Sequence, residues 1–169
     1  MREDVIISGT IMSIATSKLS LTDFHSHCLP QMDDGAANVD MAVNMLRAAA
    51  AQGAATVVAT PHFYIGQHAA PTFLKDRQDA YEQLRPHLAE DMPRLLMGAE
   101  VLIREGISRY DLHPLCLEGT NILLAEMPFM APPIWLYEEL EKIKQENKRR
   151  FAGYLARETG IVLNTDAMF

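Results

Sequence analysis

The sequence is poor in cysteine and in net positive charge, and each scarcity excludes a class of protein. Only two cysteines, Cys28 and Cys116, occur among 169 residues, so we expect no disulfide framework, and a reducing cytoplasm fits the chain. The formal net charge is −7, which argues against a nucleic-acid partner held by bulk electrostatics. The basic residues at 142–150 lie among glutamates, which is typical of a solvated helix face.

Long apolar runs are also missing. Residues 5–15 are fairly apolar, but serine, glycine and threonine interrupt them, and the run is shorter than the roughly 20 residues of a membrane-spanning helix. Residues 2–4 do not form the cationic start of a secretory signal. We therefore expect no stable membrane insertion and interpret residues 1–20 as a non-catalytic N-terminal extension. Residues 21–169 are long enough for one domain with its own core.

Strand-like and helix-like patterns alternate along the chain, which is typical of an α/β domain with a largely parallel sheet. The pattern predicts a strand at 19–24, a helix capped by Asn38 or Asp40 and ended by Gly53, a strand at 54–60, a helix at 72–90 kinked at Pro86, and strands at 95–103, 122–127 and 161–164.

The segment from Pro133 to Gly160 is almost entirely compatible with a helix. It is more than twice as long as the average globular helix of about 12 residues. Either one long helix forms, or two helices abut where a strand is absent. We favour two helices, with Asn147 as the junction.

Histidine and carboxylate side chains gather at the ends of the predicted strands. His25 and His27 lie one residue apart after the first strand, and side chains so spaced on an extended backbone point the same way. In parallel sheets, functional groups collect at the carboxyl ends of strands. We therefore predict one metal site built from convergent donors. The candidate ligands are His25, His27, Asp34, His62, Glu100 and Glu126.

The donor types indicate the metal. Imidazole nitrogen and carboxylate oxygen suit Mn²⁺, Zn²⁺ or Fe²⁺. Glu100 lies inside an apolar run, where burying an unpaired carboxylate costs several kcal/mol. A bound cation removes that cost; a salt bridge to Arg94 or Arg104 is the alternative.

Two further carboxylates, those of Glu126 and Asp33, have interpretations other than a metal ligand. For Glu126 the alternative to a ligand is a solvent-exposed strand end. Asp33 is interpreted as a turn residue or a support for a ligand, because only one of two adjacent aspartates easily faces inward.

Other catalytic arrangements find no match. The residues six positions after the two cysteines are Asp34 and Ile122, not the arginine of a thiolate phosphatase loop. The sequence has no glycine-rich phosphate loop, no Gly-x-Ser-x-Gly motif and no dinucleotide fingerprint.

Taken together, the motifs resemble those of the polymerase and histidinol phosphatase (PHP) superfamily. They are most similar to its bacterial tyrosine phosphatases from capsular and exopolysaccharide clusters. The resemblance spans roughly residues 22–145, and it is carried by Phe24–Pro30, Met32–Gly35, Ala59–His62, Gly98–Glu100 and Leu124–Pro128. It implies a distorted, TIM-like (β/α)7 barrel and a trinuclear centre, often of manganese. It also implies that the substrate is a phosphotyrosine protein, a bacterial tyrosine kinase that regulates polymer assembly.

The resemblance also assigns roles to the candidate ligands. His25 and His27 would hold the first metal, with Glu100 bridging to the second, which Glu126 helps to complete. Asp34 and His62 would hold the third. Such a cluster binds phosphate oxygens and lowers the pKa of a water that attacks phosphorus, with no covalent enzyme intermediate.

Two motifs of the family have no counterpart. An Ala-His-Pro-Glu-Arg type motif is expected after the helix that starts near Pro133, and an Asp-x-His pair is expected beyond 161–164. Two histidines and one aspartate of the family's ligand set are therefore missing. We expect an incomplete barrel without its later strands, in a truncated gene product, a fragment, or a sequence from which segments are left out.

Two other functions stay open at this point. One is a PHP phosphatase of a small phosphorylated metabolite. The other is an inactive, truncated module that binds metal or forms a homo-oligomer.

Overall fold

The computed structural model describes residues 4–7, 10–13, 21–67, 69–127 and 133–159. These residues form a mixed α/β structure with two parallel three-stranded sheets, which confirms the expected fold class at that level. The first sheet has the order β3 (Leu21–Ser26), β4 (Ala54–Ala59), β6 (Arg94–Met97). The second has the order β5 (His62–Phe63), β7 (Glu100–Leu102), β8 (Leu124–Glu126).

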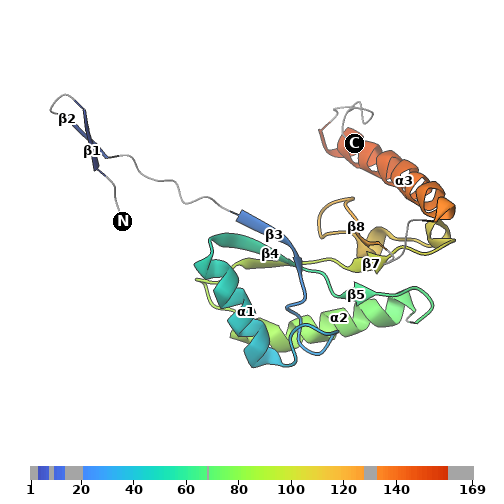
Figure 1. The fold of residues 1–169 in the computed structure, drawn as a ribbon, viewed down its shortest axis with the longest axis horizontal. Coiled ribbons are helices and arrows are strands. Elements are labelled where there is room, and N and C mark those ends of the chain that lie inside the picture. The colour runs from blue at the N-terminus through green and yellow to red at the C-terminus, as the bar shows by residue number, and fades with distance from the viewer. Residues whose placement is uncertain (1–3, 8–9, 14–20, 68, 128–132, 160–169) are drawn as a thin grey trace.

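The remaining elements surround these sheets. An antiparallel pair, β1 (Asp4–Ile7) and β2 (Thr10–Ser13), lies away from them within the predicted extension (Figure 1). Helices α1 (Val39–Ala51) and α2 (Ala70–Leu84) lie along one side of the strands, and α3 (Ile134–Thr159) lies at the far end from α1. Among the described residues, no helix combines the length and apolar character needed to cross a membrane.

The chain passes twice from the first sheet to the second within two residues. Thr60-Pro61 joins β4 to β5, and Gly98-Ala99 joins β6 to β7. Backbone pairing continues across both junctions, because Gly98 N donates to Ala59 O at 2.8 Å and Glu100 N donates to Pro61 O at 3.1 Å. The predicted single strand at 95–103 is therefore wrong, since the chain changes sheets at its centre.

The second junction favours glycine. A Cβ atom on Gly98 would lie 2.8 Å from Leu117 Cδ2 and 3.2 Å from Thr60 Cγ2, closer than van der Waals contact allows. The Gly98 carbonyl also accepts a hydrogen bond from Arg77 Nη1 of α2 at 2.5 Å. This contact fixes the residue two positions before Glu100.

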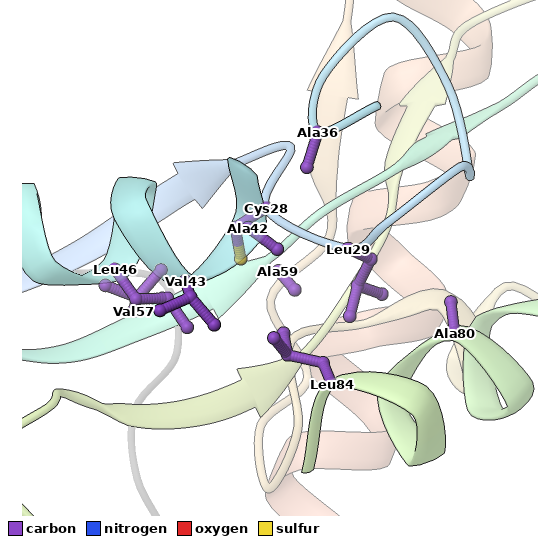
Figure 2. Packing of buried hydrophobic residues seen from close by; sticks show 10 residues of the cluster. All are labelled: Cys28, Leu29, Ala36, Ala42, Val43, Leu46, Val57, Ala59, Ala80 and Leu84. Atoms are coloured by element: carbon purple, nitrogen blue, oxygen red, sulfur yellow. The ribbon is translucent and has the colours of Figure 1, made fainter. Parts of the chain in front are cut away.

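The first core cluster lies between α1, α2 and β4. Val43 and Leu46 of α1 point towards Val57 of β4, and Ala80 and Leu84 of α2 belong to the same cluster (Figure 2). Burying a leucine side chain such as Leu46 contributes roughly 1.5–3 kcal/mol. This packing holds the strands whose ends carry the candidate ligands.

Local sequence explains where two helices begin and end. Asn38 caps α1, as one of the two alternatives predicted, since its Oδ1 accepts from Met41 N at 2.9 Å. Helix α2 starts at Ala70 rather than Thr72 and stops at Leu84, followed by a 3₁₀ turn over 85–87. Pro86 thus ends the α-helix rather than kinking it, because proline lacks the N–H that the next turn needs.

Helix α3 runs without interruption from Ile134 to Thr159. Our preference for two helices joined at Asn147 is wrong. Asparagine in a helix interior costs well under 1 kcal/mol relative to alanine, and no proline lies within the segment to break it. The predicted strand at 161–164 lies outside the described residues.

A buried carboxylate docks α3 against the body of the protein. Glu139 is 5 % exposed, and its Oε2 accepts from Ser108 N at 2.9 Å while Oε1 accepts from Lys142 Nζ at 3.2 Å. Burial raises the pKa of Glu139, but the hydrogen bonds from Ser108 and the charge of Lys142 outweigh it, and the pKa falls to about 2. The ionised carboxylate is therefore the form that holds the helix.

This geometry predicts an acid-sensitive helix. A carboxyl whose pKa is lower in the folded state stabilises that state above its ordinary pKa of 4.5, and the stabilisation is lost as the pH falls towards 2. We expect Glu139→Gln to lower the free energy of unfolding at pH 7 by about 1–3 kcal/mol. The variant should also lose less stability than the wild type between pH 7 and pH 3.

Urea unfolding followed by the fluorescence of Trp135, the one tryptophan of the chain, measures both effects. Glu141→Gln on the same helix, at an exposed position, is the matched control and should keep the wild-type pH dependence. An equal acid loss in Glu139→Gln and the wild type would contradict the role of Glu139.

Candidate metal centre

The six predicted ligands come together where the two sheets meet. His25 lies on β3, and His27 and Asp34 lie in the segment that follows it. His62 and Glu100 are the first residues of β5 and β7, and Glu126 is the last residue of β8. The carboxyl ends of β3, β4 and β6 thus face the site, as the strand-end argument predicted. His62 and Glu100 themselves lie just beyond those ends.

Glu100 is at the centre of the cluster. Its Oε2 lies 3.1 Å from His25 Nε2, 3.3 Å from His27 Nε2 and 3.1 Å from His62 Nδ1. Only 12 % of the side chain is exposed. The carboxylate therefore has three imidazole nitrogens around one oxygen, which is an unusual concentration of potential donors.

Glu100 does not form the salt bridge to Arg94 or Arg104 that was considered as the alternative to a bound cation. Arg104 Nη1 instead donates to Ile65 O at 3.4 Å. Within the part of the chain that the structure describes, the ion pairs of Glu100 are with imidazoles and not with Arg94 or Arg104.

Glu126 completes a second group of donors. Its Oε2 lies 3.4 Å from His62 Nδ1, and its side chain is 14 % exposed, so it is not the solvent-exposed strand end considered as its alternative. Three buried atoms here have no hydrogen-bond partner among the described residues: His62 Nδ1, Glu100 Oε2 and Glu126 Oε2. Leaving such atoms unpaired costs free energy. A divalent cation placed among them satisfies all three, so the donors fit a metal.

Asp34 lies at the exposed rim. Its side chain is 85 % exposed, and its Oδ1 is 3.7 Å from His62 Nε2. Three donor groups result, each with ligand atoms within 4.8 Å of one another: His25, His27 and Glu100; His27, Asp34 and His62; and His62, Glu100 and Glu126.

The shared residues limit how these groups can be filled. A neutral imidazole offers a cation one lone pair, because its other ring nitrogen carries a proton. His62 lies in two groups, since its Nδ1 faces Glu126 and its Nε2 faces Asp34, but as a neutral ring it can bind a cation in only one of them at a time. His27 can serve only one, because its Nδ1 is 2.7 Å from Asp33 Oδ2 and only Nε2 is left.

Asp33 and Tyr64 lie beside the donors. Asp33 belongs to none of the candidate donor groups, and it contacts His27 as the predicted support for a ligand should. Tyr64, which sequence reasoning missed, stacks on His62 with ring centroids 5.3 Å apart and planes at 22°. The two-residue spacing of His62 and Tyr64 was the available signal, since alternate residues of an extended chain share a face.

Cys28, although next to His27, is not a donor. The residue is fully buried, and burial raises the pKa of its thiol to about 11. It stays protonated at neutral pH and packs in the core near Ala42 (Figure 2).

The segment that carries Asp33 and Asp34 packs tightly on His27. A Cβ atom on Gly35 would lie 2.1 Å from His27 O and 2.4 Å from His27 Cβ, and Ala36 N donates to His27 O at 3.0 Å. Only glycine allows this approach.

We therefore expect Gly35→Ala to displace His27 and to weaken Mn²⁺ binding by the full chain at least about 10-fold, the scale seen when a metal ligand loses its support. Isothermal titration calorimetry measures the affinity. Gly119→Ala is the matched control, because it strains a residue with φ of +77° in the segment before β8, at the opposite end of that strand from Glu126. Unchanged Mn²⁺ affinity in Gly35→Ala would contradict the proposed packing constraint.

Comparison with known proteins identifies the family of the chain. The family model "Capsular polysaccharide synthesis, CpsB/CapC" matches residues 21–155. A tyrosine-protein phosphatase, YwqE of Bacillus subtilis, is 36 % identical over 120 residues, which cover 67 % of this chain and 45 % of YwqE.

A solved structure shares the fold. It comes from crystal structures of YwqE from Bacillus subtilis and CpsB from Streptococcus pneumoniae, described as unique metal-dependent tyrosine phosphatases. The TM-score is 0.61 at 27 % sequence identity, and the match covers 75 % of this chain and 52 % of that one. The chain thus spans about half the length of the relatives it matches. On the extent of the family match, the chain belongs to the CpsB/CapC family of capsular polysaccharide synthesis.

Proposed function

We propose that this chain is a metal-dependent phosphoesterase that hydrolyses phosphotyrosine on a protein. The observation that carries the proposal is the convergence of three buried ligand atoms, on His62, Glu100 and Glu126, that have no hydrogen-bond partner among the described residues. The names of the relatives support the same reaction, since YwqE is a tyrosine-protein phosphatase and the solved relatives are metal-dependent.

The charge of the site supports a role for cations. Glu100, Glu126, Asp33 and Asp34 place four carboxylates beside one another, and their ion pairs among the described residues are with histidines. A phosphate dianion would be repelled from such a site. Divalent cations offset that charge, and when bound they supply Lewis acidity to phosphate oxygens and lower the pKa of water.

The donors available suggest how cations are held. His25 and His27 with Glu100 would hold one, and His62 Nδ1 with Glu126 and Glu100 would hold a second. A third would have Asp34 as its main protein ligand, because Asp33 occupies His27 Nδ1 and the one lone pair of neutral His62 would go to the second cation. We propose that two cations bind more tightly than the third, and that manganese is the metal, with zinc or iron as alternatives.

The proposal extends to the fold of the domain and to its protein substrate. Residues 21–169 would form part of a PHP-type, TIM-like (β/α)7 barrel, and residues 1–20 an extension; the two adjoining parallel sheets support this. The substrate would be a bacterial tyrosine kinase that regulates capsular or exopolysaccharide synthesis, acting in the cytoplasm. The CpsB/CapC family match supports the link to capsule synthesis.

A substrate comparison tests the proposal. The metal-stripped full chain is reloaded with Mn²⁺, Zn²⁺ or Fe²⁺ and given a phosphotyrosine peptide or histidinol phosphate. We expect Mn²⁺-dependent release of phosphate from the peptide. Turnover of histidinol phosphate alone would reject the protein substrate, and bound metal without any turnover would indicate an inactive metal-binding module.

The site assignment is tested by substitution. His25→Ala and Glu100→Gln each remove a donor from the same group, so we expect either to lower peptide turnover on the order of 100-fold or more. His87→Ala, which removes an exposed histidine from the turn after α2, is the matched control and should retain activity. Full activity in His25→Ala would show that the reaction takes place elsewhere.

A further inference from the structure

One carboxylate, that of Asp33, joins candidate donors that belong to different sheets. Its Oδ2 lies 2.7 Å from Nδ1 of His27, which follows β3 of the first sheet. The same oxygen accepts a hydrogen bond from the backbone N of His62 at 3.0 Å, and His62 begins β5 of the second sheet. Asp33 therefore contacts the imidazole ring of His27 and the main chain of His62.

The contact with His27 determines which nitrogen of that ring is available. A carboxylate oxygen only accepts hydrogen bonds when ionised, so His27 Nδ1 must be the donor. In a neutral ring the lone pair is then on Nε2. That atom lies 3.0 Å from His25 Nε2 and 3.3 Å from Glu100 Oε2. Asp33 thus selects the tautomer whose lone pair faces the other donors.

Hydrogen bonds use three of the roughly four acceptor sites of the Asp33 carboxylate, and Asp33 belongs to none of the candidate donor groups. Oδ2 accepts from two donors, and Oδ1 accepts from Gly35 N at 3.0 Å. Its side chain is 8 % exposed, whereas that of Asp34, its neighbour, is 85 % exposed. Asp33 therefore supports a neighbouring histidine, whereas Asp34 is free to act as a ligand at the exposed rim.

We infer that Asp33 is a positioning residue that orients His27 and His62 for cation binding without binding a cation itself. The inference deepens the proposed metal-dependent function and rests on it for its consequence. It predicts that loss of Asp33 disturbs donors on both sheets at once. Loss of Asp34 disturbs only the exposed group around His62 Nε2.

The ring tautomer tests the inference without any metal. Long-range ¹H–¹⁵N correlation spectra of the metal-free full chain at pH 8 distinguish a proton on Nδ1 from one on Nε2. We expect His27 to carry its proton on Nδ1 in the wild type and in Asp34→Ala, and to lose that preference in Asp33→Ala. A proton on Nε2 in the wild type, or an unchanged His27 in Asp33→Ala, would overturn the inference.

Metal affinity supplies the second readout. Calorimetric titration with MnCl₂ should show binding weakened 10- to 100-fold in Asp33→Ala, the usual effect of losing a carboxylate that supports a histidine ligand. Thermal unfolding checks that the variant is folded. Asp33→Asn keeps the size of the side chain but has one oxygen for three donors, so it should also bind Mn²⁺ more weakly. Wild-type affinity in both variants would overturn the inference.

The two proposals fail in different ways. A wild type that binds no Mn²⁺ rejects the metal centre, while the His27 tautomer still decides the role of Asp33. A wild type that binds Mn²⁺ and hydrolyses the phosphopeptide, with Asp33 variants of equal affinity and tautomer, keeps the function and rejects the positioning role.

Discussion

The carboxylate of Glu100, buried among three imidazole nitrogens, is the interaction on which the rest of the arrangement depends. A carboxylate in such a place is costly unless a positive charge meets it. The nearby atoms that could meet it are themselves lone-pair donors on His25, His27 and His62. A cation bound among these atoms would offset the cost of burying the carboxylate, so the cluster suits a metal site better than a purely structural contact.

The abrupt change of sheet at Thr60-Pro61 and at Gly98-Ala99 creates this cluster. Both junctions lie beside each other, joined by the hydrogen bond from Gly98 N to Ala59 O. His62 and Glu100 are each the first residue after such a two-residue junction, so they emerge at the same level and pair in register. The core between α1, α2 and β4 and the hydrogen bond from Arg77 hold the junctions in place.

The convergence of the six candidate donors could be expected from sequence, because five of them lie at or beside the ends of apolar runs and Asp34 lies in the turn that follows His27. Helix α1 could likewise be expected from local sequence, with Asn38 as one of two predicted caps. The break at Gly98 could not be predicted, because it depends on pairing with β4 and β5, which are distant in sequence. The continuity of α3 was misjudged because the expectation of a missing strand outweighed helix propensity. The contact of Asp33 with His62 also required the fold.

The junction of the two sheets has a thermodynamic consequence. Donors on β3 belong to one sheet, and those on β5, β7 and β8 belong to the other. A cation bound between them would therefore link the two sheets. Ligands that bind only the folded state add RT ln(1 + [L]/Kd) to stability, about 4 kcal/mol at a thousandfold excess over Kd. Metal loading and the docking of the two halves are then a single equilibrium. Under the proposed function, cellular metal supply would set how much of this protein is folded as well as how much is active.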